Sequence, residues 1–119
     1  MIVGVPKEIK PDEKRVSVLP HLVKPIIELG HSFIIQKGAG EESGFSDNLY
    51  SSEGATIVET IEDVYASADF IIKVKEPLEE EVRIIKDSQI LFTFFHFAAY
   101  TDLLENFLKK NAIAIAYET

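Results

Sequence analysis

Residues 69–74 read Asp-Phe-Ile-Ile-Lys-Val, a nearly continuous apolar run, and this stretch decides the fold. A strand that is apolar on both faces is typical of a parallel sheet covered by helices on both sides. The flanking sequence supplies such helices. Thr60, with Asp63 at the capping-box position, predicts a helix before the run, and residues 79–86 predict one after it. The pattern therefore indicates a strand between two crossover helices.

The same alternation of short apolar runs and helical patterns extends along the whole chain. A helix is expected over residues 20–29, where Gly30 supplies the stop and Pro25 predicts a kink or a later helix start. Other strands are expected at residues 2–5, 32–36, 56–58, 90–95 and 112–117, and other helices at 46–53 and from 101 onward. The predicted fold class is α/β: a doubly wound, mostly parallel sheet of about six strands, flavodoxin-like or Rossmann-like, with helices on both faces.

Length and composition predict one domain over residues 1–119, long enough for one hydrophobic core but not two. The net charge of −8 argues against a nucleic-acid partner, because phosphate binding needs an excess of Lys and Arg. No apolar run approaches the ~20 residues that span a bilayer, so no membrane segment is expected. The absence of cysteine excludes disulfides and thiolate chemistry, and with no secretion signal it fits a cytoplasmic protein.

The last predicted strand, residues 112–117, is followed by no helix. In a doubly wound sheet a strand without a covering helix leaves apolar surface exposed. We therefore expect another segment, domain or subunit to lie against this part of the sheet.

Three cationic or proton-carrying side chains follow predicted strands. Arg15 lies on the loop after the first strand, Lys75 directly follows the 69–74 strand, and His96 directly follows the 90–95 strand. Ligands of open parallel sheets bind outside the carboxyl ends of the strands, so these loops should meet at one edge. Arg can bind a carboxylate through two hydrogen bonds, Lys can polarise a carbonyl, and His can exchange a proton near neutral pH. The set indicates a site for a small carboxylate.

Each of these residues also has a simpler interpretation. Arg15 ends a stretch, residues 7–15, in which seven of nine residues are ionisable, and such a loop is expected to be solvated. Lys75 could be an ordinary surface residue at a strand end. His96 stands among Phe and Ala residues and could be a hydrogen-bonded core histidine. Only their convergence at one edge favours a site.

Other motifs predict structure and not chemistry. The segment 38–44, Gly-Ala-Gly-Glu-Glu-Ser-Gly, departs from a dinucleotide fingerprint in its third glycine, and its two glutamates would repel a pyrophosphate. It is predicted to form a turn, so no cofactor site is expected within the chain. His21 and His31 are expected at the surface or as helix caps. Residues 79–81, three glutamates, are predicted to be a solvated helix start and not a metal site.

These residues also carry a resemblance to a known family. The chain resembles the N-terminus of alanine dehydrogenases in the segments Gly4-Val5-Pro6-Lys7-Glu8-Ile9-Lys10, Glu13-Lys14-Arg15-Val16, Leu19-Pro20, Gly30-His31, Gly38-Ala39-Gly40, Ser43-Gly44-Phe45, Lys73-Val74-Lys75-Glu76-Pro77-Leu78, Leu91-Phe92-Thr93 with His96, and Ala114-Ile115-Ala116-Tyr117-Glu118-Thr119. The resemblance covers essentially all 119 residues, in order and in register.

The resemblance implies an enzyme that interconverts L-alanine with pyruvate and ammonia and uses NAD. It implies that Arg15 binds the substrate carboxylate, that Lys75 contacts the carboxylate and carbonyl, and that His96 transfers protons. It also implies a homo-oligomer, a hexamer in the family, and an NAD-binding domain that follows this one. With that domain absent from residues 1–119, the chain alone is expected to be inactive.

Two alternatives stay open at this point. The N-terminal part of the alpha subunit of a proton-translocating NAD(P) transhydrogenase is similar in sequence, although that family does not keep the His and Lys matched here by His96 and Lys75. A non-catalytic module that binds carboxylates, or that associates with a partner through its uncovered sheet face, would also fit the residues. A signalling receiver domain does not, because the first strand leads to Pro6-Lys7 and not to an acidic pair.

Overall fold

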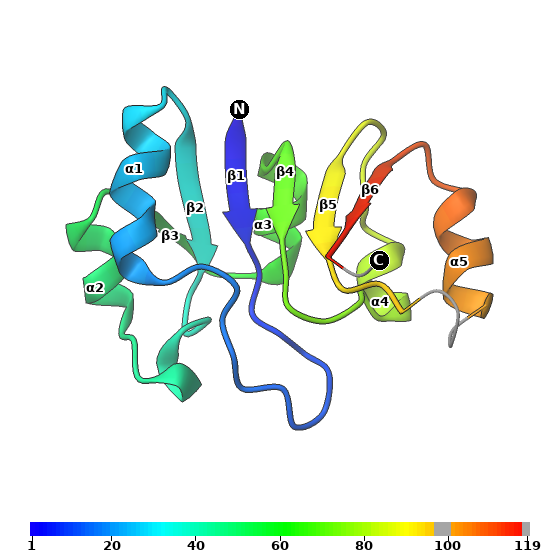
Figure 1. The fold of residues 1–119 in the computed structure, drawn as a ribbon, viewed down its shortest axis with the longest axis horizontal. Helices are drawn as coiled ribbons and strands as arrows, with labels where there is room; N and C mark the ends of the chain where they lie inside the picture. The colour runs from blue at the N-terminus through cyan, green and yellow to red at the C-terminus, as the bar shows by residue number, and fades with distance from the viewer. Residues whose placement is uncertain (97–100, 118–119) are drawn as a thin grey trace.

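The computed structural model describes residues 1–96 and 101–117 and contains a parallel sheet in the order β3-β2-β1-β4-β5-β6 (Figure 1). Every strand pair is parallel. The strands are β1 (Ile2–Val5), β2 (Ser32–Gln36), β3 (Thr56–Val58), β4 (Phe70–Ile72), β5 (Ile90–Thr93) and β6 (Ile113–Ala116). The α-helices are α1 (Val23–Glu28), α2 (Asp47–Ser52), α3 (Ile61–Ser67), α4 (Glu79–Val82) and α5 (Thr101–Leu108), and the 3-10 turns are η1 (Pro20–Leu22) and η2 (Glu41–Ser43).

The strand order confirms the predicted doubly wound sheet. The chain builds outward from β1 through β2 to β3, returns to the other side of β1 as β4, and continues to β5 and β6. The direction of winding reverses between β1 and β4, which pair through Val3↔Phe70 and Gly4↔Ile71. Open α/β sheets bind ligands in the crevice at this switch point, outside the carboxyl ends of the strands.

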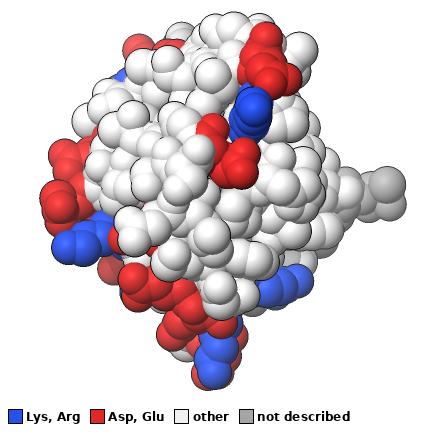
Figure 2. Space-filling model, turned by 90° about the vertical axis from the view of Figure 1, so that its left-hand side faces the viewer, with Lys and Arg blue, Asp and Glu red and all other residues white. Residues whose placement is uncertain are grey.

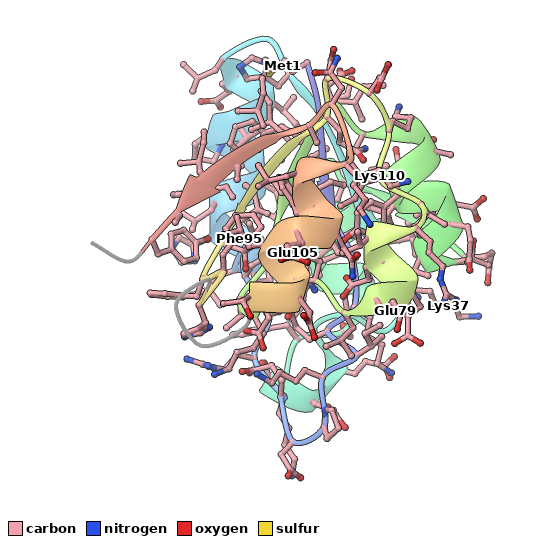
Figure 3. All side chains as sticks on the ribbon, turned by 90° about the vertical axis from the view of Figure 1, so that its right-hand side faces the viewer. Met1, Lys37, Glu79, Phe95, Glu105 and Lys110 are labelled. Carbon is pink, nitrogen blue, oxygen red and sulfur yellow. The ribbon has the colours of Figure 1, made fainter. Side chains whose placement is uncertain are left out.

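Alternating side chains divide the interior into two cores. On β2, Phe33 and Ile35 belong to the core beneath α1 and α2, whereas Ile34 belongs to the core on the opposite face. That second core is completed by α3, α4 and α5, and it includes Val64, Ile71 and Phe107. Figure 3 labels Phe95, whose ring meets that of Phe107 edge to face at 5.3 Å. Both faces of the central strands are therefore covered, as the apolar run at 69–74 predicts.

One part of the sheet has no helix over it within the described residues. No helix lies over β4, β5 and β6 on the side turned to the viewer in Figure 1. The ring of Tyr117 lies 4.2 Å from that of Phe92 and 4.7 Å from that of Phe94. Ile113 and Ile115 on β6 are 50% and 42% exposed. The apolar surface expected beside the last strand is present.

Local signals explain most element ends. Thr60 and Asp63 form the predicted capping box, with hydrogen bonds of 3.1 and 3.2 Å. Gly30 follows α1 with φ +96°, a conformation that costs a residue with a Cβ free energy. Pro25 falls in the first turn of α1, where no backbone donor is needed, and the α-helix begins at Val23 after η1, so the structure is closer to the predicted later helix start. Leu108, the last residue of α5, is 70% exposed.

No helix in the described part of the chain has the length and apolar character needed to cross a bilayer. Acidic and basic side chains are interspersed on the side that Figure 2 shows, and blue residues lie next to red ones. With the net charge of −8, this surface presents no broad cationic area to the viewer.

Gly4 allows β1 and α3 to approach closely. A Cβ at this position would lie 2.6 Å from the Cβ of Ala68 and 3.0 Å from Cγ1 of Val64. We expect Gly4→Ala to lower the free energy of unfolding by about 1–3 kcal/mol, measured by urea denaturation, because the added methyl overpacks this contact. The double variant Gly4→Ala/Ala68→Gly should recover part of the loss, and a Gly4→Ala chain as stable as the wild type would contradict the close approach.

Candidate functional site

The long loop between β1 and η1 lies across the carboxyl ends of the central strands, at the bottom of Figure 1. Side-chain hydrogen bonds attach it on both sides of the switch point. Ser17 Oγ donates to the carbonyl of Ile72 at the end of β4 (2.7 Å), and Ser43 Oγ donates to the carbonyl of Lys14 (2.8 Å). The loop that carries Arg15 is therefore fixed to the strand end that precedes Lys75.

A buried ionic cluster of Glu8, Lys73 and Glu81 joins this loop to the sheet. Lys73 Nζ lies 3.2 Å from Glu8 Oε1 and 2.9 Å from Glu81 Oε1, and the three side chains are 1%, 3% and 1% exposed, in the order Lys73, Glu8, Glu81. The prediction of a solvated loop over residues 7–15 is wrong for Glu8. Glu8 is buried because its charge is matched at the end of β4, not because the loop is apolar.

Glu8 also holds the backbone that precedes the proposed site. Its carboxylate accepts hydrogen bonds from the backbone N–H groups of Val74 and Lys75, both at 3.1 Å. Burial raises the pKa of Glu8, and Lys73 together with these two N–H groups opposes that effect. Burial would lower the pKa of Lys73, but the charges of Glu81 and Glu8 outweigh burial and raise it. The lysine therefore stays cationic.

Glu81 anchors the start of α4 to the same cluster. Its carboxylate accepts hydrogen bonds from the hydroxyl of Tyr65 (3.0 Å) and the N–H of Leu78 (2.9 Å). Complete burial, with the neighbouring Glu81 charge, raises the pKa of the Tyr65 phenol well above its usual value. The prediction that residues 79–81 are all solvated holds for Glu79, which is exposed and paired with Arg83, but is wrong for Glu81.

Arg15 and Lys75 line one cavity of about 390 Å³ at the carboxyl edge, together with residues 10–14. The Arg15 guanidinium donates to both carboxylate oxygens of Glu13, from Nε at 2.9 Å and from one terminal nitrogen at 2.7 Å. These bonds lower the pKa of Glu13 to about 2, although burial acts in the other direction, and the nearby Lys75 lowers it further. Arg15 lies at the edge where it is predicted, whereas its partner Glu13 was not predicted.

His96 lies at the same edge, three residues after β5, with φ +56°. Its Nδ1 is 3.0 Å from Oε2 of Glu76, a carboxylate that is only 4% exposed. Lys10 forms a salt bridge with the other oxygen of Glu76. Burial alone would raise the pKa of Glu76, but hydrogen bonds from Lys10, a backbone N–H and His96 lower it overall. The His96 ring also stacks near that of Phe94, with centroids 6.0 Å apart.

The structure brings the three predicted residues to one edge of the sheet, but they do not all line the same cavity. Thr93 Oγ1 at the end of β5 donates to the carbonyl of Lys75 (2.9 Å), which joins the segments that carry Lys75 and His96. Arg15 and Lys75 share the cavity, whereas His96 is not among its lining residues. Lys10 connects the two groups, because it lines the cavity and also binds the carboxylate that contacts His96.

The glycine-rich segment 38–44 does not fit a dinucleotide. It forms a tight turn and η2, with Gly38 at φ +79° and its N–H donated to Asp47. A Cβ on Gly40 would lie 2.7 Å from the ring of Tyr50, so this glycine packs against the protein's own core. Glu41 and Glu42 add negative charge, which opposes a pyrophosphate. The segment serves as the predicted turn.

The site geometry places the chain among α/β proteins with a ligand edge, and comparison with known sequences places it more closely. A family model described as "Alanine dehydrogenase/PNT, N-terminal domain" matches residues 4–119. The chain belongs to this family. The alanine dehydrogenase of Methanococcus maripaludis is 45% identical over all 119 residues, and that of Bacillus subtilis is 44% identical. The chain spans 32% and 31% of their respective lengths.

Solved structures of the alanine dehydrogenase/PNT family have the same fold. An L-alanine dehydrogenase superposes with a TM-score of 0.96 at 42% identity, and the match covers 100% of this chain and 33% of that one. A transhydrogenase from Sinorhizobium meliloti superposes with a TM-score of 0.91 at 26% identity, over 98% of this chain and 34% of that one. The alanine dehydrogenases are the more similar group by sequence, and the shared architecture confirms the α/β fold.

We expect Lys73→Met to lower the free energy of unfolding by about 3–5 kcal/mol at neutral pH, because it leaves two carboxylates buried without a cation. In this variant Glu8 stays buried without its cation, so its folded pKa, which burial already raises, lies above the unfolded one. The loss should therefore shrink as the pH falls through that raised folded pKa. Urea denaturation at neutral pH and near pH 5 measures both effects.

The matched control is Lys37→Met. Lys37 Nζ lies 3.9 Å from Glu59, and both side chains are largely exposed, so this substitution should cost less than about 1 kcal/mol. Equal losses for the two variants would show that the buried cluster contributes no more than a surface ion pair.

Proposed function

We propose that residues 1–119 are the substrate-binding part of an NAD-dependent alanine dehydrogenase, which interconverts L-alanine with pyruvate and ammonia. The observation that carries the proposal is the cavity of about 390 Å³ that Arg15 and Lys75 line together. Arg15 and Lys75 are two of four cationic side chains on a lining that also holds Asp12 and Glu13, and in a chain of net charge −8 this local excess of positive charge suits a small carboxylate. The family match and the alanine dehydrogenase relatives support the choice of substrate.

Arg15 is proposed to bind the substrate carboxylate. Guanidinium carries five N–H donors in a planar fork, and the two hydrogen bonds to Glu13 leave three for a ligand. Glu13 orients the guanidinium before the substrate arrives, which reduces the side-chain entropy lost on binding. The ionised Glu13 also offers no hydrogen-bond donor to a carboxylate, so the substrate has to be bound through the free edge of the arginine.

Lys75 is proposed to contact the carboxylate and the adjacent carbonyl oxygen. The two hydrogen bonds that hold its backbone, from its N–H to Glu8 and from Thr93 to its carbonyl, fix the point from which the side chain extends. An ammonium beside the carbonyl stabilises the negative charge that develops on oxygen when a nucleophile adds to the carbon. Removal of one such donor commonly costs about 3 kcal/mol of transition-state stabilisation.

His96 is proposed to exchange a proton with the substrate oxygen, which leaves as water when the addition product of ammonia and pyruvate becomes an imine. The imidazole is 39% exposed and lies three residues after β5, which is the neighbour of β4, the strand that precedes Lys75. The reduced cofactor, NADH, would supply the hydride to the imine, and we assign its binding to a domain outside residues 1–119, since segment 38–44 does not fit a dinucleotide. We also propose that the protein is cytoplasmic and that it is a homo-oligomer, a hexamer by resemblance to the family. Size-exclusion chromatography with light scattering would test the oligomeric state.

The test of the proposal is calorimetric titration of the chain with pyruvate. We expect millimolar binding by the wild type. Arg15→Ala and Lys75→Ala should each weaken binding at least about tenfold, because hydrogen bonds to charged groups contribute roughly 1.5–3 kcal/mol. Lys37→Ala is the control, because Lys37 is largely exposed and is not among the residues that line the cavity. Absence of binding by the wild type at millimolar pyruvate, or equal affinity in all variants, would contradict the proposed site.

Arg15→Lys separates a bidentate contact from simple charge attraction. The variant keeps the positive charge but loses the planar fork, so we expect weaker pyruvate binding than in the wild type. The same titration measures the effect, with acetate as a ligand that has the carboxylate but no carbonyl. Unchanged pyruvate affinity in Arg15→Lys would show that Arg15 contributes only its positive charge and not a bidentate contact.

A further inference from the structure

The carboxylate of Glu76 contacts two side chains, the imidazole of His96 and the ammonium of Lys10. Oε2 lies 3.0 Å from His96 Nδ1, and Oε1 forms a salt bridge with Lys10 Nζ. Glu76 is 4% exposed at its side chain, so water contributes little to its solvation. Lys10, His96 and a backbone N–H therefore provide the compensation that a buried carboxylate requires.

The chemistry of these groups determines which nitrogen of His96 carries a proton. An ionised carboxylate only accepts hydrogen bonds, and an ammonium only donates them. At 3.0 Å from Glu76, Nδ1 must then be the donor. In the neutral ring the proton lies on Nδ1, and Nε2 is the basic nitrogen. Histidine free in water favours the opposite tautomer, with the proton on Nε2.

The backbone of His96 has an unfavourable conformation. Its φ of +56° lies in the left-handed region, which costs free energy in any residue with a Cβ. The imidazole ring is held by two contacts, with Glu76 at Nδ1 and with the stacked ring of Phe94. These contacts fix the orientation of the ring and offset the cost of the backbone conformation. A side chain held in this way presents one defined nitrogen to its surroundings.

We propose that Glu76 is a positioning residue that holds His96 in the Nδ1–H tautomer, with Lys10 binding the second carboxylate oxygen, so that Nε2 is the nitrogen that exchanges protons. The inference rests on the proposed function only in assigning that proton to the substrate. The tautomer itself is a property of the Lys10–Glu76–His96 contacts.

The full 119-residue chain, labelled with ¹⁵N, tests the tautomer directly. Two- and three-bond ¹H–¹⁵N correlation spectra at alkaline pH, where imidazoles are neutral, distinguish a protonated ring nitrogen from an unprotonated one. We expect His96 Nδ1 to be protonated and Nε2 unprotonated. His21, an exposed side chain in η1, is the internal reference for the solution preference. A wild-type His96 protonated mainly on Nε2 would overturn the proposal.

Glu76→Gln should invert the tautomer. Lys10 can only donate, so the amide oxygen of the glutamine turns to Lys10 and its NH₂ group turns to His96. Nδ1 then has to accept a hydrogen bond, and the proton moves to Nε2. Lys10→Met, which leaves the carboxylate in place, should keep the Nδ1–H form. The double variant Lys10→Met/Glu76→Gln frees the amide to rotate and should restore Nδ1–H in part.

Amide spectra of each variant show whether it is folded. If Glu76→Gln fails to fold, the wild type and Lys10→Met still decide the proposal, because both must show Nδ1–H. An Nε2–H tautomer in Lys10→Met, or the same tautomer in a folded Glu76→Gln variant as in the wild type, would overturn it. Pyruvate is absent from these measurements, so their outcome is independent of the titration that tests the proposed function.

Discussion

The buried lysine at the end of β4 is the interaction on which the rest of the structure depends. Lys73 is 1% exposed and binds Glu8 from the β1–η1 loop and Glu81 from α4, so it joins three parts of the chain at one point. A buried charge is tolerated only when its partners are in place, so the three parts of the chain have to meet in one defined arrangement. Its effect extends outward, because Glu8 also holds the backbone of Val74 and Lys75.

Positive charge at the carboxyl edge is organised in pairs with carboxylates. Arg15 is oriented by Glu13, Lys73 is neutralised by Glu8 and Glu81, and Lys10 is bound to Glu76, which contacts His96. In a chain with 20 acidic and 12 basic residues, such pairing keeps the cations in fixed positions. Fixed charges stabilise a developing charge without reorganisation, which is the main advantage that an enzyme site has over water.

The fold could be predicted from local pattern, but the electrostatic core could not. The apolar run at 69–74, the Thr60–Asp63 capping box and the position of Gly30 are signals contained within a few residues, and the structure bears each of them out. The edge positions of Arg15, Lys75 and His96 follow from strand order. The burial of Glu8 and Glu81 does not, because both stand in charged segments and their partner Lys73 is 65 and 8 residues away. Pairing across such distances is decided by tertiary contacts.

The sheet topology also determines the order in which the molecule can assemble. β1 is a central strand that pairs with β2 on one side and with β4 on the other. Its pairing with β4 closes a loop of more than 60 residues, and such non-local pairing slows folding. β4 follows β2 and β3 along the chain, so β1 stays paired on one side only until β4 has been synthesised, and the cluster around Lys73 cannot form before Glu81 has been added.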